Sequence, residues 1–233
     1  MAEAIRHLKA VDPKLGELID KTKEVCVMSL PRDSVDDSSF VSLSQSIVYQ
    51  QLAGKAAQAI LLRFLRRFGE PKSAGAGSPP DRDDPSLGCD DFVFPSADVV
   101  ATLDVDEMKA VGLGQRKAEY ISAVAARFND GTLSDERLAA MSDDEVSRAL
   151  VAIRGIGQWS ADMFLMFHLK RPNVLPTLDL AVRKAMCAHF GVPFGKKTPS
   201  HEQMVEMGRA WEPYRSVASW YMWRLAGTIT QKS

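Results

Sequence analysis

The sequence predicts an all-α protein built from many short helices. Apolar residues recur at three- and four-residue spacing in most segments, for example over residues 5–19. Helix start signals are frequent, and Ser142 with Glu145 three residues later has the pattern of a capping box. Strand signals are weak, because no segment alternates between apolar and polar residues over a sustained length. The turn dipeptide Asp130-Gly131 lies between two predicted helices instead.

Length and composition are those of a soluble globular protein. The chain has 233 residues, 45% hydrophobic and 25% charged, enough for one large domain or two small ones. Cys26, Cys89 and Cys187 are far apart and odd in number, which favours a reducing compartment over a disulfide framework or a cysteine zinc site. No run of about 18 apolar residues predicts a membrane span, and the first residues lack the apolar core of a secretory signal.

The charge is distributed unevenly along the chain. The net charge of −1 combines −7 over residues 1–150 with +6 over residues 151–233. A basic C-terminal third favours an anionic partner such as nucleic acid, although random scatter of surface charge is the alternative.

The N-terminal half contains three predicted helical segments, over residues 1–30, 40–51 and 55–68. Asp12-Pro13 supplies an N-cap and a first-turn residue. A polar loop at 31–38 and a short break at Leu52-Ala53-Gly54 separate the segments.

Residues 72–91 form a segment rich in Gly, Ser, Pro and Asp. This composition predicts a flexible, low-complexity insertion or linker, and it contains no catalytic constellation.

Helices recur in the second half, and we expect them at residues 99–102, from Asp104 or Asp106 to about Gly112, and at 115–128, 135–140 and 143–153. Gly112-Leu113-Gly114 could be read as a phosphate-binding hairpin, but we interpret it as a helix end followed by a turn.

Two turns within residues 151–184 stand out, and each precedes a helix. Gly155-Ile156-Gly157 joins two apolar helical runs, and a glycine hairpin of this kind can point backbone N–H groups at a phosphate. Pro176-Thr177 leads into a helix with Asp179 at its start. A plain helix-turn-helix in a core is the alternative.

The motifs LxxIxGIGxWSAxMF (150–164) and LPxxDLxVRK (175–184) resemble those of the helix-hairpin-helix (HhH-GPD) DNA glycosylases. Within that superfamily the chain is most similar to the alkyladenine (3-methyladenine) DNA glycosylase II branch of bacteria and yeasts. Stretches at 46–57, 112–118 and 211–216 also match. The resemblance covers residues 35–228 without the insertion, and it implies a two-lobed helical glycosylase core over 1–228. The helix-hairpin-helix is expected at about 143–168, with a DNA cleft between the lobes.

The resemblance implies that Asp179 is the catalytic carboxylate. Cleavage of an N-glycosidic bond develops positive charge on the sugar, which a carboxylate stabilises while it orients water. A role as helix N-cap alone is the alternative. Asp162 is a rival carboxylate that we expect to face solvent. Leu178 and Ala181 stand where related sequences often carry glycine, so they add bulk beside the sugar site.

Trp159 bears on both the reaction and the substrate. Bifunctional members carry a lysine nucleophile two residues after the second hairpin glycine, where this chain has Trp159, so no lyase activity is expected. The resemblance places Trp159, Met163 and Trp223 around a flipped base, with Tyr49 and Trp220 as looser candidates. Electron-rich rings attract the positive charge of alkylated purines. Aromatic core packing is the alternative for Trp220 and Trp223.

Base extrusion requires a side chain that fills the gap in the stack. By resemblance this wedge is Gln51, flanked by Leu52, and the alternative is a plain helix–helix turn at Ala53-Gly54.

The hairpin is expected to bind the DNA backbone without reading sequence. The donors would be the backbone N–H groups of Gly155, Gly157, Gln158 and Trp159. A monovalent cation such as Na⁺ or K⁺ would sit on the backbone carbonyls of Val151, Ile153 and Gly155. An iron–sulfur cluster is not expected, since Cys187 is the one cysteine of the C-terminal half.

These observations predict a monofunctional base-excision-repair glycosylase that removes 3-methyladenine- and 7-methylguanine-type bases from damaged double-stranded DNA and leaves an abasic site. No cofactor would be required, and the protein would act as a monomer, in the nucleus of a eukaryote or otherwise in the cytoplasm. The alternatives are a non-catalytic damage-binding protein and a glycosylase for other lesions such as oxidised guanine.

Overall fold

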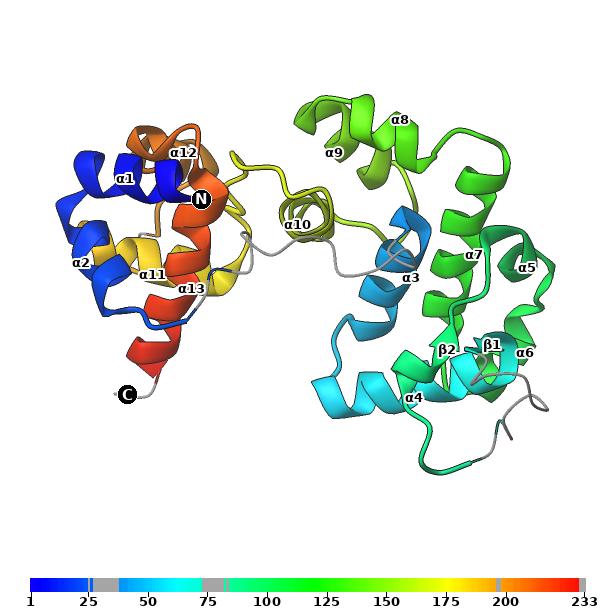
Figure 1. Ribbon diagram of the computed structural model, residues 1–233. Coiled ribbons are helices and arrows are strands. Elements are labelled where there is room, and N and C mark those ends of the chain that lie inside the picture. The colour runs from blue at the N-terminus through cyan, green and yellow to red at the C-terminus, as the bar shows by residue number, and fades with distance from the viewer. Residues whose placement is uncertain (25, 27–37, 73–81, 83, 196–197, 231–233) are drawn as a thin grey trace. The chain divides into compact units, whose positions relative to one another are not determined.

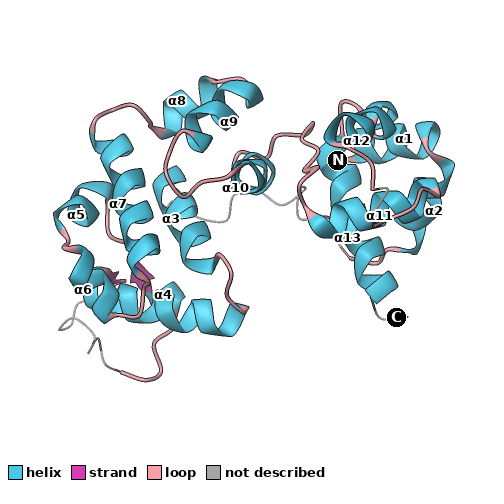
Figure 2. Cartoon of the chain, turned by 180° about the vertical axis from the view of Figure 1, so that it is seen from behind, coloured by secondary structure: helices cyan, strands magenta, loops and turns pink. Residues whose placement is uncertain are grey.

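The computed structural model describes residues 1–24, 26, 38–72, 82, 84–195 and 198–230. The polar loop predicted at 31–38, except Ser38, lies outside these residues, as do residues 73–81 and 83 of the predicted insertion and residues 25 and 27–30 of the first predicted helical segment. The chain forms two compact units. We call residues 1–32 with 158–233 the terminal unit, and residues 33–157 the central unit. Figure 2 shows helices in both units, as the sequence predicts. No described helix is long and apolar enough to cross a membrane.

The central unit contains seven α-helices among its described residues, with one pair of two-residue strands. Its elements are α3 (Ser39–Tyr49), α4 (Gly54–Phe68), β1 (Glu70–Pro71), η2 (Cys89–Asp91), β2 (Phe92–Val93), α5 (Ala97–Thr102), α6 (Val105–Ala110), α7 (Gln115–Asn129), α8 (Asp135–Ala140) and α9 (Asp143–Val151). Aromatic rings fill its core, where Phe94 lies 5.3 Å from Phe64 and 6.0 Å from Phe40 between ring centroids. The apolar residues of α3 and α4 recur at helical spacing, so each helix buries one face in this core.

Local capping explains where these helices begin. Ser134, Ser142 and Asp104 each accept a backbone N–H with the side chain, and Ser142 forms the predicted capping box with Glu145. Gly112 has a φ of 97° at the end of α6, so the Gly112–Gly114 segment is the helix end and turn that we expected.

Two short strands flank the predicted insertion. β1 and β2 pair antiparallel, with Glu70 opposite Val93, and close the base of the segment. Arg66 of α4 donates to the carbonyl oxygens of Asp84 and Leu87 at 2.8 and 3.1 Å. The described residues of this segment therefore include contacts with α4.

The terminal unit joins the two ends of the chain. Its elements are α1 (Ala2–Val11), α2 (Pro13–Lys21), α10 (Gln158–Met163), the π-helical turn η3 (Phe164–His168), α11 (Leu180–Phe190), α12 (His201–Met207), η4 (Arg209–Trp211) and α13 (Arg215–Thr230). In Figure 1 the blue N-terminal helices lie with the orange and red C-terminal ones. α11 packs against α13, and both contribute to one core with α1 and α2.

Asp12 ties the N-terminal helices to this core. Its carboxylate caps α2 through the Leu15 N–H and accepts hydrogen bonds from His189 at 2.7 Å and Trp211 at 2.9 Å. Burial opposes ionisation of Asp12, but these hydrogen bonds outweigh it and hold the pKa of the carboxyl below its ordinary value. The predicted helix at 1–30 is thus two helices that meet at the Asp12-Pro13 cap.

Candidate functional site

Asp179 stands at the start of α11, where a tight loop delivers it. The N–H of Thr177 donates to the Leu175 carbonyl oxygen, and the N–H of Asp179 donates to that of Pro176 at 3.0 Å. The Asp179 side chain caps the helix by accepting the Val182 N–H on Oδ1 at 2.9 Å. Capping is therefore one role of this carboxylate, and it fixes the orientation of the carboxyl group.

Two tryptophan side chains complete the surroundings of this carboxylate. The indole N–H of Trp159 donates to Oδ2 of Asp179 at 2.8 Å, and that of Trp223 donates to Oδ1 at 3.0 Å. An ionised carboxylate has about four acceptor positions, two on each oxygen. Among the described residues Oδ1 receives two N–H donors and Oδ2 receives one. Oδ2 therefore keeps an acceptor position for a ligand or a water molecule.

Exposed apolar side chains lie next to Asp179. Trp159, in the first turn of α10, is 45% exposed, and its bond to Asp179 sets the orientation of a ring that solvent can reach. The two residues on either side of Asp179 are also exposed, Leu178 at 55% and Leu180 at 67%. The Leu178 side chain, which we expected to add bulk beside the sugar site, faces solvent. Exposed apolar side chains beside a charged group are typical of a binding surface.

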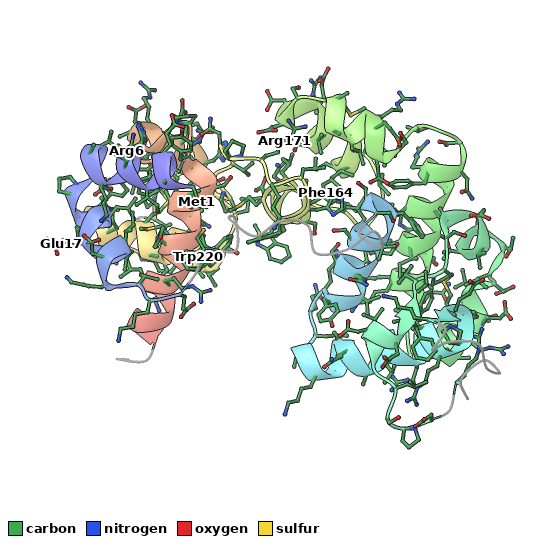
Figure 3. The ribbon with its side chains drawn as sticks, viewed as in Figure 1. Met1, Arg6, Glu17, Phe164, Arg171 and Trp220 are labelled. Atoms are coloured by element: carbon green, nitrogen blue, oxygen red, sulfur yellow. The ribbon has the colours of Figure 1, made fainter. Side chains whose placement is uncertain are left out.

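The other predicted pocket residues differ in accessibility. Trp223 is partly buried, with its ring 5.6 Å from that of Phe167, and Met163 is also partly buried. Trp220, labelled on α13 in Figure 3, is 2% exposed and lies in the core under the Arg224 guanidinium. Its ring has the aromatic core position that was the alternative for this residue.

A buried polar group lies on the inner side of α10. Asp162 is 6% exposed and accepts a hydrogen bond from the Gln158 amide at 2.8 Å. Burial raises the pKa of its carboxyl to about 6. The prediction that Asp162 faces solvent is wrong, because Ser160, Ala161 and Asp162 are all buried while Trp159 is exposed. Asp179 is the accessible carboxylate of the two.

The hairpin depends on its two glycines for different reasons. Gly155 has a φ of 98°, and a Cβ there would lie 2.1 Å from the ring of Tyr120. Gly157 would place a Cβ in open space. Packing therefore requires glycine at the first position, whereas the open side of Gly157 leaves room for close approach of a ligand.

The backbone carbonyls that we expected to hold a cation are partly engaged. The Ile153 oxygen accepts the Ile156 N–H at 3.1 Å, and the Gly155 oxygen accepts the Gln50 side-chain amide at 3.2 Å. A carbonyl oxygen has two lone pairs, so these two with Val151 still fit a monovalent cation in donor type and number. No cluster of three or more His, Cys, Asp or Glu suited to a metal ion occurs among the described residues.

The predicted wedge, Gln51 with Leu52, lies in the turn between α3 and α4 of the central unit. We call this turn, residues 50–53, the wedge turn. Gln51 is exposed and has a φ of 56°, a left-handed conformation that is uncommon for a residue other than glycine. Leu52 is 39% exposed. Tyr49, the last residue of α3, is exposed as well. These three side chains are therefore accessible at one turn.

The sequence matches a known family. The model of the HhH-GPD superfamily of base excision DNA repair proteins matches residues 45–213. The chain belongs to this superfamily.

One relative and two solved structures each match most of the chain. The Bacillus subtilis protein YfjP is 33% identical over 82% of this chain, which spans 60% of the length of YfjP. The solved DNA-3-methyladenine glycosidase of Bacillus halodurans is 29% identical with a TM-score of 0.75, covering 98% of this chain and 91% of that one. The Schizosaccharomyces pombe 3-methyladenine DNA glycosylase Mag1, solved in complex with abasic DNA, is 26% identical with a TM-score of 0.67, and the match covers 95% of each chain.

Three residues of this HhH-GPD protein were missed by sequence reasoning. Tyr120 packs on Gly155, and the Arg154 guanidinium lies 5.9 Å from the Tyr120 ring while pairing with Glu119. Lys117 of α7 contacts the wedge turn. A basic residue inside the hairpin motif was a usable signal for Arg154. Tyr120 and Lys117 lie on α7, far from the hairpin and the wedge in sequence, so no local pattern could reveal their contacts.

Proposed function

We propose that this protein is a monofunctional DNA glycosylase that excises alkylated purines, of the 3-methyladenine and 7-methylguanine type, from damaged double-stranded DNA. The observation that carries the proposal is the Asp179 carboxylate, which both tryptophan indoles orient beside an exposed aromatic face. The names of the relatives from Bacillus halodurans and Schizosaccharomyces pombe support this substrate class.

Asp179 acts on the sugar. When the N-glycosidic bond breaks, its electron pair leaves with the base and positive charge develops on the deoxyribose. An ionised carboxylate stabilises that charge, and its free acceptor position on Oδ2 orients the attacking water. Addition of water to C1′ releases one proton to Oδ2 or to solvent, and an abasic site remains. A 7-methylguanine-type base is already cationic, so it leaves as a neutral molecule without a proton from the protein.

Trp159 supplies the selectivity for charged bases. A cation over an indole face gains about 0.5–2 kcal/mol, which a neutral purine does not gain. The indole N–H is held by Asp179, so the ring is oriented before the base arrives. Trp223 holds the other carboxylate oxygen, and Met163 and Tyr49 are further candidates for contact with the base.

DNA binding is assigned to the hairpin and the wedge turn. Backbone N–H groups of Gly155, Gly157, Gln158 and Trp159 bind phosphate, and Gln51 with Leu52 fills the gap that the flipped base leaves. A monovalent cation on the carbonyls of Val151, Ile153 and Gly155 would add positive charge next to the phosphate. No other cofactor takes part in the proposed reaction. The protein would act as a monomer in the compartment that holds the genome, the nucleus in a eukaryote and the cytoplasm otherwise.

Base release from methylated DNA tests this proposal. Duplex DNA treated with dimethyl sulfate is incubated with wild type and with Asp179→Asn, and free bases are quantified by mass spectrometry. Loss of the carboxylate charge should reduce release by roughly 10²–10³-fold or more, while affinity for duplex with an abasic analogue survives. Glu17→Gln, an equivalent neutralisation at an exposed site on α2, is the matched control.

Two outcomes would favour the alternatives. Tight binding to lesion duplex without base release by wild type indicates a non-catalytic damage-binding protein. Release of 8-oxoguanine in preference to methylated purines, from duplexes that carry each lesion, indicates a glycosylase of another specificity.

A further inference from the structure

The wedge turn adopts a backbone conformation that its own sequence disfavours. α3 ends at Tyr49, the chain reverses through Gln50 and Gln51, and α4 begins at Gly54. Gln51 occupies the left-handed region with a φ of 56° although it has a side chain. A non-glycine residue persists there only where neighbouring structure holds it. Contacts from outside the turn must therefore stabilise it.

Lys117 of α7 provides such a contact. Its ammonium group donates to the carbonyl oxygens of Val48 and Gln50, each at 2.7 Å. These carbonyls lie in the last turn of α3 and just beyond it, where oxygens lack helical partners and the helix dipole is negative. The site is partly buried, and desolvation lowers the pKa of Lys117. The ammonium group thus binds the Gln50 carbonyl, directly before Gln51, through a short, charge-assisted hydrogen bond.

A second hydrogen bond connects the wedge turn to the hairpin. The side-chain amide of Gln50 donates to the carbonyl oxygen of Gly155 at 3.2 Å. Gly155 in turn packs closely against the ring of Tyr120, also on α7. One helix of the central unit therefore supports both the wedge turn and the first glycine of the hairpin.

We propose that Lys117 is the positioning residue of the wedge: by binding the Val48 and Gln50 carbonyls it presets Gln51 for insertion into the DNA stack. This inference rests on the proposed function of Gln51 in base flipping. Lys117 does not touch the substrate. Its removal should therefore affect the steps that need a wedge and spare those that do not.

Single-stranded DNA separates these steps. A base in a single strand has no duplex to leave, so its excision does not need a side chain that fills a gap between paired bases. Lys117→Met keeps the apolar stem and removes the three donors. It should reduce excision from a methylated duplex by roughly ten- to a hundredfold, the cost of an unsupported left-handed residue. Excision from the same oligonucleotide as a single strand should stay close to wild type.

A second readout does not depend on catalysis. 2-Aminopurine placed opposite a tetrahydrofuran abasic analogue reports, by its fluorescence, whether a side chain enters the stack. Wild type should change this signal on binding, and Lys117→Met should bind the duplex with little change in signal. Lys117→Arg retains donors for both carbonyls and should recover part of the wild-type response. Lys109→Met, at an exposed lysine of α6 paired with Asp106, is the matched control.

Failure of the inference about Lys117 and failure of the proposed function give different results. Equal loss on duplex and single strand, or a Lys117→Met variant that behaves as Lys109→Met, overturns the inference. If wild type releases no base from either form, the proposed function fails and the fluorescence arm alone decides the role of Lys117. Lys117→Gln, which keeps an amide donor, replaces the methionine variant if that variant unfolds, and an intermediate response is then expected.

Discussion

Asp162→Asn should stabilise the terminal unit at alkaline pH and have little effect at acidic pH. Asp162 is buried on the inner side of α10, where it accepts a hydrogen bond from Gln158. Asparagine has nearly the same shape and offers the same acceptor atom without a charge. The substitution therefore removes the cost of burying a carboxylate and keeps its hydrogen bond.

The magnitude follows from the raised pKa. Burial raises the pKa of Asp162 from 3.8 to about 6 in the folded protein. Each pKa unit corresponds to about 1.36 kcal/mol, so two units set an upper bound of about 3 kcal/mol for the penalty at pH 8. Relaxation around the charge lowers the expected gain to about 1–2 kcal/mol. Because the folded pKa is the higher one, the wild-type protein loses stability relative to the variant as pH rises from about 4 to about 6, the difference then stays constant, and the two proteins converge as pH falls toward 4.

Tryptophan fluorescence can follow this unit by itself. All four tryptophans of the chain lie between residues 159 and 223, within the terminal unit. Urea unfolding of wild type and Asp162→Asn at pH 5, 6, 7 and 8 gives the stability difference at each pH. Glu17→Gln on α2 should show a small difference that barely changes over this range. A difference for Asp162→Asn that is flat from pH 5 to 8, or a destabilised variant at pH 8, would refute the reasoning.

Four further predictions concern the fold and the reaction. Asp12→Ala should lower the free energy of unfolding of the terminal unit by about 2–4 kcal/mol, since three N–H donors lose their acceptor; urea unfolding measures this. Gly155→Ala should destabilise the central unit because its Cβ meets the ring of Tyr120, whereas Gly157→Ala should fold normally and bind DNA more weakly, as circular dichroism and fluorescence anisotropy can show. Trp159→Phe keeps an aromatic face but loses the N–H bond to the Asp179 carboxylate, so, on the proposed function, the single-turnover rate of base excision should fall by about tenfold with lesion affinity largely retained. Wild type should not be trapped on abasic-site DNA by borohydride, and efficient trapping would contradict the assignment of a monofunctional enzyme.

Predictions from the sequence held where the interaction is local. The capping box of Ser142 with Glu145 and the cap at Asp12 involve residues three apart, so the residue types themselves specify the geometry. They failed where distant residues meet. The pairing of β1 with β2 on either side of the 72–91 segment was not predicted, and Asp162 is buried although we expected it to face solvent. Neither feature leaves a periodic signal in the chain.

The sequence by itself determined the all-α class, the glycine hairpin, and Asp179 at the start of a helix, because periodicity and caps depend on neighbours within a few positions. The tertiary structure decided how the carboxylate is held. Trp159 and Trp223 are 20 and 44 residues away from Asp179, yet they donate to its two different oxygens. Trp220 and Trp223 lie three residues apart on α13, but one is enclosed in the core and the other reaches the carboxylate. Spacing on a helix gives the direction of a side chain, and only the packed neighbours determine whether that direction leads into the core or to the site.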